Sequence, residues 1–400
     1  MASVISFPRR EVQVIGLISV AHFLSHFYLT SLVPLYASIA SELGVSWTSL
    51  SWGITAYVVC TGVLQTPMGY LVDRIGGRWV LVFGLFFLAG GIGSIGFATE
   101  FWHLIGLMAL AGLGNSVFHP ADYSIISVSV ADDRLGKAFS MHSFGGSSGM
   151  VVGPLVMALF IQLDVPWRTS VLVVGAIGIV LAFVLLAFGG IIDESGATKR
   201  KREPPPWRLL LTSRPILLLF LFYLFSSAAN AGVVHFSVAA LGTIYGLPIV
   251  AATLALTFYQ GGSLALTLPG GLLADRTKHH HRLMVVCLAI SAAMVALVGL
   301  NILPFWSVIV ALALSGGARG LVTAARDVNV RHSAGSHSVG TVFAFVSTGF
   351  LFGGAVALPI YGLVLDHAPP ETVFLISAVM TLGAIFATIV HSRTKILWCP

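Results

Sequence analysis

The first candidates for chemistry are six ionisable side chains within otherwise apolar stretches of the chain: His22, His26, His119, Asp122, His235 and Arg319. Groups of this kind are costly in hydrocarbon and usually face a bundle interior or an aqueous cavity. His22 and His26 are four residues apart and therefore share one face of a helix. Because histidine changes charge near neutral pH, this pair is a candidate proton carrier.

Other interpretations of these residues stay open at this point. His22 and His26 could chelate a transition metal if a third ligand such as His119 came near, or they could be hydrogen-bonded packing residues. His119 precedes Pro120, which removes a backbone donor and can bend the helix. Asp122, if buried, could take up and release protons; an ion pair with Arg326 is the equally weighted alternative.

Arg319 lies deep in an apolar stretch and stays charged in almost any protein environment. A fixed cation there requires a balancing group, which is either an internal acceptor such as Asp122 or an anionic part of a substrate. We slightly favour a substrate carboxylate or phosphonate. Three further residues are candidates for hydrogen bonding the rest of a substrate, although such residues also join helices: Asn230, Tyr259 and Gln260.

The elements that must position these residues are membrane-spanning helices. Only 9% of the chain is charged, against about 25% in a soluble domain, and 57% is hydrophobic. A span needs about 20 apolar residues. The sequence predicts twelve spans, at 12–40, 47–71, 79–99, 102–130, 136–163, 167–191, 215–242, 249–274, 282–301, 305–326, 336–364 and 372–392.

The basic residues predict the orientation of the chain in the membrane. All Lys and Arg residues except Arg168 and Arg319 fall on the side shared by both termini, and basic residues are retained on the cytoplasmic side. We therefore expect an integral protein of the plasma membrane, specifically a bacterial inner membrane, with both termini cytoplasmic. The net charge of +6 follows from this topology and does not indicate nucleic-acid binding. The basic run 199–202 is interpreted as a topology anchor that favours anionic lipid.

A ten-residue segment, 65–74, recurs at 267–276 with Pro, Gly, Leu, Asp and Arg in the same places. The repeat predicts a duplicated membrane unit, because each copy follows an apolar run and opens a short charged turn. These turns could latch one conformation on the cytoplasmic face or simply set topology. The second copy has Lys278 in place of Gly76 and His280 in place of Arg78. The candidate latch residues are Gly69, Asp73, Arg74, Gly76, Arg78, Gly271, Asp275 and Arg276.

The domain organisation follows from the repeat and from one long polar connection that contains Pro204, Pro205 and Pro206. We predict an N-terminal six-helix bundle at 1–192, a cytoplasmic linker at 193–214 and a C-terminal six-helix bundle at 215–400. No segment has the pattern of a nucleotide-binding loop, so ATP-driven transport by this chain alone is not expected. We expect a monomer without a cofactor, without a resident metal ion and without enzyme activity.

At the repeated turn the chain resembles the major facilitator superfamily, whose signature between helices 2 and 3 has this pattern and whose two six-helix halves are parallel repeats. Residues 112–120 and 144–155 are similar to its fosmidomycin-resistance branch, a group associated with drug efflux driven by proton entry. In that branch an acidic residue follows a histidine of helix 1 by four positions, where this chain has His22 and His26. Gly149, Gly153 and Pro154 resemble the glycine-proline motif of superfamily antiporters, although ordinary close packing explains them about as well.

The resemblance implies an all-α membrane fold of twelve helices in two pseudo-symmetric bundles, with helices 1, 4, 7 and 10 lining a central cavity. The predicted function is secondary active transport of a small organic anion or amphiphile by alternating access, with proton-coupled efflux preferred. Proton-coupled import of a carboxylate or metal chelate is the alternative within transport. A membrane-embedded metal-dependent enzyme and a non-transporting receptor are the alternatives of other classes.

Overall fold

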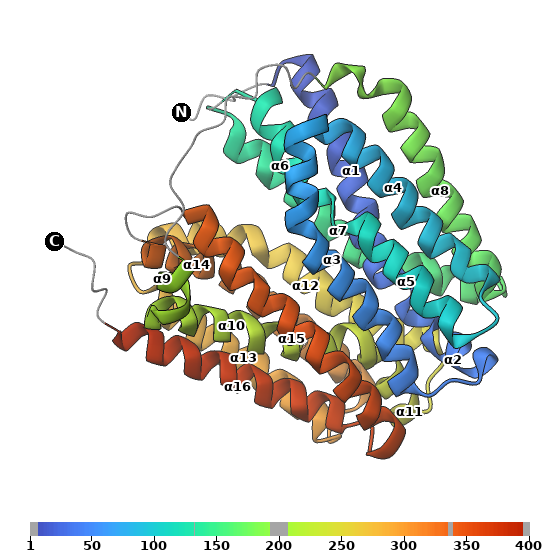
Figure 1. The fold of residues 1–400 in the computed structure, drawn as a ribbon. Helices are drawn as coiled ribbons and strands as arrows, with labels where there is room; N and C mark the ends of the chain where they lie inside the picture. Colours follow the sequence, from blue (N-terminus) through green and yellow to red (C-terminus); the bar gives the residue numbers. More distant parts are fainter. Residues whose placement is uncertain (1–6, 132, 193–206, 335–338, 395–400) are drawn as a thin grey trace. The chain divides into compact units, whose positions relative to one another are not determined.

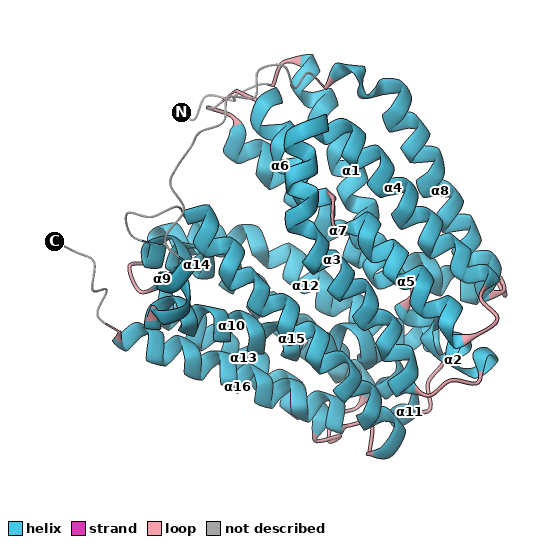
Figure 2. Cartoon of the chain, viewed as in Figure 1, coloured by secondary structure: helices cyan, strands magenta, loops and turns pink. Residues whose placement is uncertain are grey.

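The chain folds entirely as helices and short connections in the part that the computed structural model describes, which is residues 7–131, 133–192, 207–334 and 339–394 (Figure 2). This follows from composition, because an apolar segment in hydrocarbon must satisfy its backbone hydrogen bonds within itself, as a helix does. The predicted linker overlaps the undescribed stretch 193–206, so the basic run 199–202 and its prolines lie outside the described residues; 207–212 form the short helix α9 (Trp207–Thr212).

Helices of the first half of the chain form spans close to the predicted ones (Figure 1). The first span continues to Leu43, a little beyond its predicted end, because a short 3-10 turn joins two helices there. The helices are α1 (Arg9–Ser31), η1 (Val33–Leu35), α2 (Tyr36–Leu43), α3 (Trp47–Ile75), α4 (Gly77–Ser94), η2 (Ile95–Phe97), α5 (Phe101–Asn115), α6 (Phe118–Ser129), α7 (Leu135–Gln162), α8 (Trp167–Phe188) and η3 (Gly189–Ile191).

The second half repeats this order of long apolar helices. Its largest departure from prediction is α14, which runs on from the predicted end at 326 to Ala334. After α9 the helices are α10 (Arg214–Ala231), the π-helix η4 (Gly232–Phe236), α11 (Ser237–Tyr245), α12 (Ile249–Arg276), α13 (His280–Gly299), α14 (Phe305–Ala334), α15 (Val339–His367) and α16 (Thr372–Arg393).

Eleven spans within the described residues are long and apolar enough to cross a membrane, and α3 is the twelfth. At 29 residues α3 is about 43 Å long, which exceeds the thickness of the hydrocarbon core. Its first turns carry Trp, Thr and Ser, which dilute its apolar character. The protein therefore has the predicted fold, an all-α membrane protein with twelve spans.

The chain separates into two compact units, 1–45 with 52–199 and 46–51 with 200–400, which we call the first and second bundle. Residues 46–51 join the second bundle because the Asp366 carboxylate accepts hydrogen bonds from the backbone N–H groups of Trp47 and Thr48, at 2.9 and 2.8 Å. The domain boundaries predicted from the sequence, 1–192, 193–214 and 215–400, stay a prediction.

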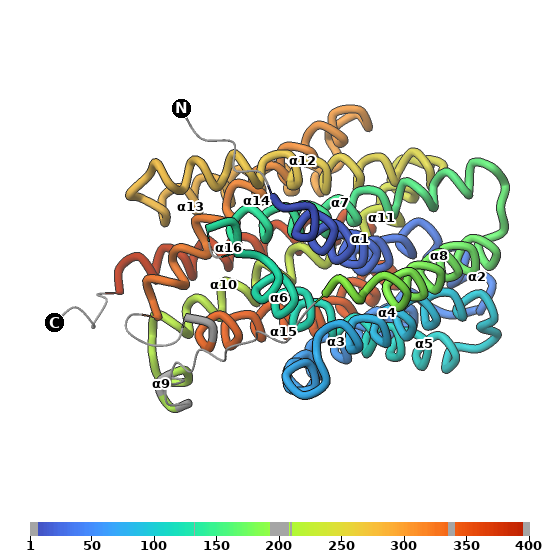
Figure 3. Tube along the Cα trace, turned by 90° about the horizontal axis from the view of Figure 1, so that it is seen from above, coloured from blue at the N-terminus to red at the C-terminus, as the bar shows by residue number. Residues whose placement is uncertain are grey.

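The same helix pairs pack inside each bundle. In the first bundle α1 packs on α7, and α4 lies against both α5 and α8 (Figure 3). In the second bundle the equivalent pairs are α10 with α15, and α13 with both α14 and α16. Gly44 and Gly246 end equivalent helices with the same left-handed φ of 61°, a conformation that favours glycine. The duplication thus extends well beyond the ten-residue motif.

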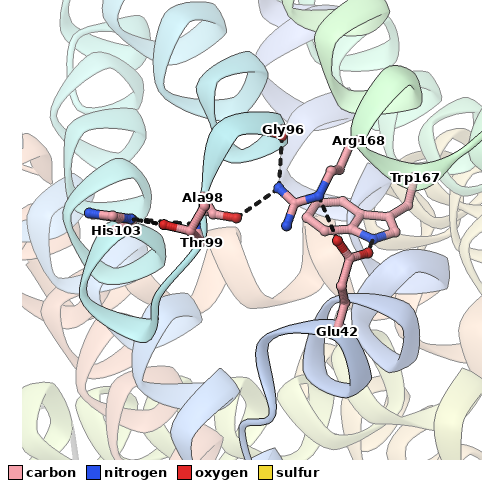
Figure 4. A network of polar contacts seen from close by, with 7 residues as sticks. All are labelled: Glu42, Gly96, Ala98, Thr99, His103, Trp167 and Arg168. Atoms are coloured by element: carbon pink, nitrogen blue, oxygen red, sulfur yellow. Dashed lines mark hydrogen bonds and ion pairs between the residues drawn. The ribbon is translucent and has the colours of Figure 1, made fainter.

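Arg168, the basic residue predicted on the side opposite the termini, is held by a local network (Figure 4). Its Nε donates to the Glu42 carboxylate at 2.7 Å, and its Nη1 donates to the carbonyls of Gly96 and Ala98 at 2.8 and 2.7 Å. The indole N–H of Trp167 donates to the second Glu42 oxygen. This arginine is therefore neutralised within the first bundle and joins the ends of three helices.

Candidate functional site

A buried carboxylate between two histidines forms the polar centre of the first bundle. Asp122 of α6 is 0% exposed, and the flanking His22 of α1 and His142 of α7 are 4% and 1% exposed. His22 Nδ1 lies 3.1 Å from Asp122 Oδ2, in hydrogen-bond geometry. His142 Nε2 lies 3.4 Å from the same oxygen but makes no hydrogen bond there. Two helices, α1 and α7, thus direct a ring nitrogen each at one carboxylate oxygen that a third helix, α6, carries.

Two further histidines surround this centre. The His26 ring centroid lies 4.5 Å from that of His22, and the His119 ring centroid lies 5.4 Å from it. His26 Nδ1 is buried without a hydrogen-bond partner, whereas the His119 side chain is exposed. We call these five residues, His22, His26, His119, Asp122 and His142, the histidine cluster.

Glycines of α7 allow its backbone to approach α1 closely enough for the cluster to form. A Cβ on Gly149 would meet the backbone of Phe23, and one on Gly153 would meet the backbone of Phe27. A Cβ on Gly146 would strike the His22 ring itself, so this glycine provides the space that the ring occupies. The predicted packing role of Gly149 and Gly153 therefore agrees with their contacts; their role in setting transport direction stays a prediction.

Prolines shape the two helices that carry Asp122 and His142. The helix that holds Asp122 is interrupted between α5 and α6 at 116–117, one turn before Pro120, which is where a proline frees a carbonyl. In α7, Pro154 leaves the carbonyl of Met150 without its usual helical donor, and the Thr30 hydroxyl of α1 donates to it at 3.2 Å. This bond adds a polar tie between α1 and α7.

The structure brings His22, His26, His119 and Asp122 together, and it adds His142, which sequence reasoning missed. His142 lies inside an apolar span and so met the same criterion as the others. The resemblance predicts that helices 1, 4, 7 and 10 line the cavity, whereas α7 is the fifth span. The predicted partner of Asp122 among the arginines, Arg326, pairs with its neighbour Asp327 at 2.8 Å.

In the second bundle, the charged side chain predicted to bind a substrate is Arg319 of α14. Its Nη2 donates to the carbonyl of Ser226 in α10 at 2.8 Å, and it forms no ion pair with any described residue. A Cβ on Gly316 would meet the backbone of Tyr259, and one on Gly320 would meet the backbone of Ser263. The backbone beside Arg319 is thus pressed against α12, while the guanidinium reaches to α10.

The predicted substrate-binding residues of the second bundle lie on the helices next to Arg319. Asn230 Oδ1 accepts a hydrogen bond from the Tyr259 hydroxyl at 2.8 Å, and this bond joins α10 to α12. Gln260 follows Tyr259 and is 8% exposed. His235 lies in the π-helix η4 and is also 8% exposed. A π-helical turn within an α-helix is a local distortion that often accompanies functional sites.

The two repeated turns make different contacts with their surroundings. Arg74 donates to the hydroxyl of Tyr70 at 2.7 Å, and Asp73 forms no hydrogen bond or ion pair with a described residue. Arg78 donates to the carbonyl of Leu186 in α8 at 2.9 Å. In the second copy Gly271, Asp275 and Arg276 lie in the last turns of α12. The latch role of both turns stays a prediction.

Arg134, at one end of the first bundle, has acidic partners. Arg134, which lies between spans, donates to both oxygens of Glu11 at 2.8 and 2.9 Å, and this pair raises the pKa of Arg134. Arg134 also lies 3.1 Å from Asp133. Such bidentate pairs are the usual way to neutralise a partly buried arginine. Arg319 differs from Arg134, because among the described residues its only hydrogen-bond acceptor is a backbone carbonyl.

Comparison with known proteins agrees with the fold and the duplicated halves. The family model of the Major Facilitator Superfamily matches residues 18–303 and 220–396. The fosmidomycin resistance protein of Escherichia coli is 24% identical over 388 residues, covering 94% of this chain and 91% of the relative. The multidrug efflux protein YfmO of Bacillus subtilis is 25% identical over 360 residues, covering 87% and 85%.

Solved structures of transporters share the fold. A bacterial homologue of the human lysosomal transporter Spinster, in an inward-facing and occupied conformation, has a TM-score of 0.79 at 14% identity, covering 99% of this chain and 100% of that one. The nucleoside transporter NupG has a TM-score of 0.78 at 14% identity, covering 95% and 100%. The twelve spans, the repeated turn and the family match together establish that the chain belongs to the Major Facilitator Superfamily and is a membrane transporter, not an enzyme.

Proposed function

We propose that this transporter exports a small organic anion or anionic amphiphile in exchange for protons, by alternating access. The observation that carries the proposal is the unpaired guanidinium of Arg319 inside a membrane span. Arg134, Arg168 and Arg326 each have a carboxylate within 2.9 Å, whereas Arg319 bonds only a carbonyl among the described residues. A permanent cation in this setting favours binding of an anion.

The guanidinium fork suits a planar or tetrahedral oxyanion, because it can donate two parallel hydrogen bonds to a carboxylate or phosphonate. One of its nitrogens is used by the Ser226 carbonyl, so others remain for a ligand. Asn230, Tyr259 and Gln260 supply amide and hydroxyl groups on the adjacent helices for the uncharged remainder of the substrate. One cationic group beside several uncharged polar groups suits a small anion better than a neutral or cationic drug.

Relatives support export as the direction. Besides the resistance and efflux proteins above, the lincomycin resistance protein of Streptomyces lincolnensis is 29% identical over 184 residues, covering 46% of this chain and 37% of the relative. Export against a gradient requires a driving ion, and the inward proton gradient of a bacterial membrane is the proposed one. The same residues could serve import, so direction is tested by gradients and not by mutation.

The role of Arg319 is tested by substrate counterflow in proteoliposomes, over a panel of carboxylates and phosphonates that includes fosmidomycin. We expect Arg319→Ala to weaken binding of the anion by about 10- to 100-fold, since a charge-assisted hydrogen bond contributes about 1.5–3 kcal/mol. Arg331→Ala is the matched control, because Arg331 is an exposed arginine of the same helix. Equal counterflow in Arg319→Ala and Arg331→Ala would refute the anion-binding role.

Direction and coupling are tested with the wild-type chain in vesicles of known orientation. A proton gradient directed from the periplasmic to the cytoplasmic face should drive the anion the opposite way, and a reversed gradient should reverse the flux. Movement of the anion together with the proton would replace export by import. Flux that is insensitive to either gradient would remove the proton from the proposal.

A further inference from the structure

We propose that the first bundle contains a binding site for one divalent transition-metal ion such as Zn²⁺, with His22, Asp122 and His142 as its protein ligands. This site is separate from Arg319, which lies in the second bundle, and it does not depend on the proposed anion export. Each of the three residues comes from a different helix, α1, α6 and α7. Their ligand atoms all lie within 4.8 Å of one another.

The distances agree with those of a tetrahedral site. With metal–ligand bonds of about 2.0–2.1 Å, neighbouring ligand atoms of a tetrahedral zinc site lie about 3.3 Å apart. His22 Nδ1 and His142 Nε2 lie 3.1 and 3.4 Å from Asp122 Oδ2. Two of the three ligand pairs therefore already have the spacing of a tetrahedral site, and the third pair lies within 4.8 Å.

The hydrogen bonding within the group is incomplete, as expected for atoms that converge on a common point. The 3.4 Å approach of His142 Nε2 to Asp122 lacks hydrogen-bond geometry. Asp122 Oδ1 and both ring nitrogens of His142 have no hydrogen-bond partner. Water cannot replace that partner easily, because the two residues are only 0% and 1% exposed. Buried polar atoms in native proteins are normally paired, so this concentration of unpaired atoms in one place indicates a missing ligand.

The ligand types select a metal class. Two imidazoles and one carboxylate suit Zn²⁺, Co²⁺ or Ni²⁺, whereas Ca²⁺ and Mg²⁺ prefer oxygen ligands alone. Three protein ligands leave one position open. His26, whose ring lies 4.5 Å from that of His22 and whose Nδ1 is unpaired, could fill it. His119 is exposed and 5.4 Å from His22, which makes it the point of access for an ion.

Gly146 provides a way to disturb the site without removing a ligand. It faces the His22 ring so closely that an added methyl group would displace the ring. Gly136, on the same helix, has open space where a Cβ would be. The two glycine-to-alanine changes are chemically identical, but we expect them to differ in their effect on metal binding.

The test uses the full chain, purified in detergent with an affinity tag that lacks histidine and stripped with a chelator. Zn²⁺ is then titrated against a chromophoric competitor. We expect one equivalent to bind to the wild type, and we expect Asp122→Asn, His142→Ala and Gly146→Ala each to weaken the affinity by at least about 100-fold. Gly136→Ala and His103→Ala should bind as the wild type does, because both positions lie outside the cluster.

A second histidine group, in the second bundle, requires its own control. The rings of His281 and His391 lie 5.1 Å apart, and a pair of this kind could also take up Zn²⁺. His281→Ala should leave the single equivalent unchanged. If His281→Ala removes that equivalent while Asp122→Asn retains it, the ion belongs to the second bundle and the proposal is wrong.

Co²⁺ substitution gives a measurement that is independent of variant folding. The wild-type protein with one equivalent of Co²⁺ should show the strong visible absorption of a four-coordinate site, and Zn²⁺ should displace it. Absence of stoichiometric binding by the wild type, or unchanged affinity in both Asp122→Asn and Gly146→Ala, overturns the proposal. In that case the cluster is left with the proton-carrying role predicted from the sequence.

Discussion

The two bundles use the same helix pairs but hold opposite kinds of polar group in their interiors. In the first, Asp122 and four histidines gather where α1, α6 and α7 meet. In the second, Arg319 reaches a carbonyl and has no described carboxylate beside it. The two bundles thus share a repeated scaffold and differ in a few interior residues. A cation in the first interior and an anion in the second are the ligands that we propose.

The repeated turns differ for a simpler reason. Gly76 alone separates α3 from α4, and its φ of 89° is one that side chains rarely adopt. The second copy has Lys278 at this position, and there 277–279 separate α12 from α13. His280 then donates to the carbonyl of Ala274 at 3.0 Å. The copy without this glycine thus has a longer turn, and a side-chain hydrogen bond is found there in place of the left-handed backbone conformation.

The largest effect is expected where each bundle presses two backbones together. A Cβ on Gly149 would meet the backbone of Phe23, and one on Gly349 would meet the carbonyl of Phe220. Gly149→Val and Gly349→Val should each reduce the free energy of unfolding by about 3 kcal/mol or more, because backbone cannot yield as a side chain does. Unfolding in SDS titrations measures this, with Gly136→Val as the control. Tolerance of only one substitution would break the equivalence of the two bundles.

The interior polar groups should differ in their effect on stability. Asp122→Ala leaves the buried His22 Nδ1 without its hydrogen-bond partner and should cost about 2 kcal/mol. Arg319→Met removes a cation that has no counter-charge among the described residues and fills similar space, so stability should not fall. The same SDS titration compares the two variants. A large loss in Arg319→Met would mean that the arginine serves packing and not a ligand.

The turns should respond unequally to the same substitution. Gly76→Ala places a side chain in a backbone region that is essentially restricted to glycine and should cost about 1–2 kcal/mol. Lys278→Ala, at the equivalent position, should change stability by less than about 0.5 kcal/mol, because its side chain is exposed and its φ is not positive. Equal costs at the two positions would show that the turns remain alike despite their sequences.

The smallest expected effect concerns a bond that we find in the first bundle. Thr30→Val should cost about 1 kcal/mol, because the carbonyl of Met150 loses the hydroxyl that replaces its helical donor. In a Pro154→Ala background the helix can bond that carbonyl itself, so the cost of Thr30→Val should fall toward zero. Melting temperatures of the four proteins in this double-mutant cycle provide the comparison. If the effects of Thr30→Val and Pro154→Ala on stability are additive, the Thr30 hydroxyl does not compensate for the helical hydrogen bond that Pro154 removes.

Most of the fold could be predicted from sequence, whereas the site could be predicted only in part. Local sequence pattern predicts the positions of the spans and the repeat. It also identifies four candidate site residues: His22, His26, Asp122 and Arg319. His142 lies in an apolar span as the others do, but it was not predicted, because the fifth span is not among the helices that the family resemblance places around the cavity. The partner of Arg168, Glu42, lies in a helix far along the sequence, and no local pattern links the two.

Sequence alone determined that this protein is a helical, duplicated membrane protein, because an apolar chain in a bilayer has no water to satisfy its backbone and must form spanning helices. Its role as a transporter was predicted from the repeated turn and its resemblance to the major facilitator superfamily. Tertiary structure decided which polar groups meet. Gly146, Gly149 and Gly153 let α7 approach α1, and the break before Pro120 carries Asp122 to the same place. The physical reason is that a binding site depends on the convergence of side chains from different helices, and that convergence is set by packing.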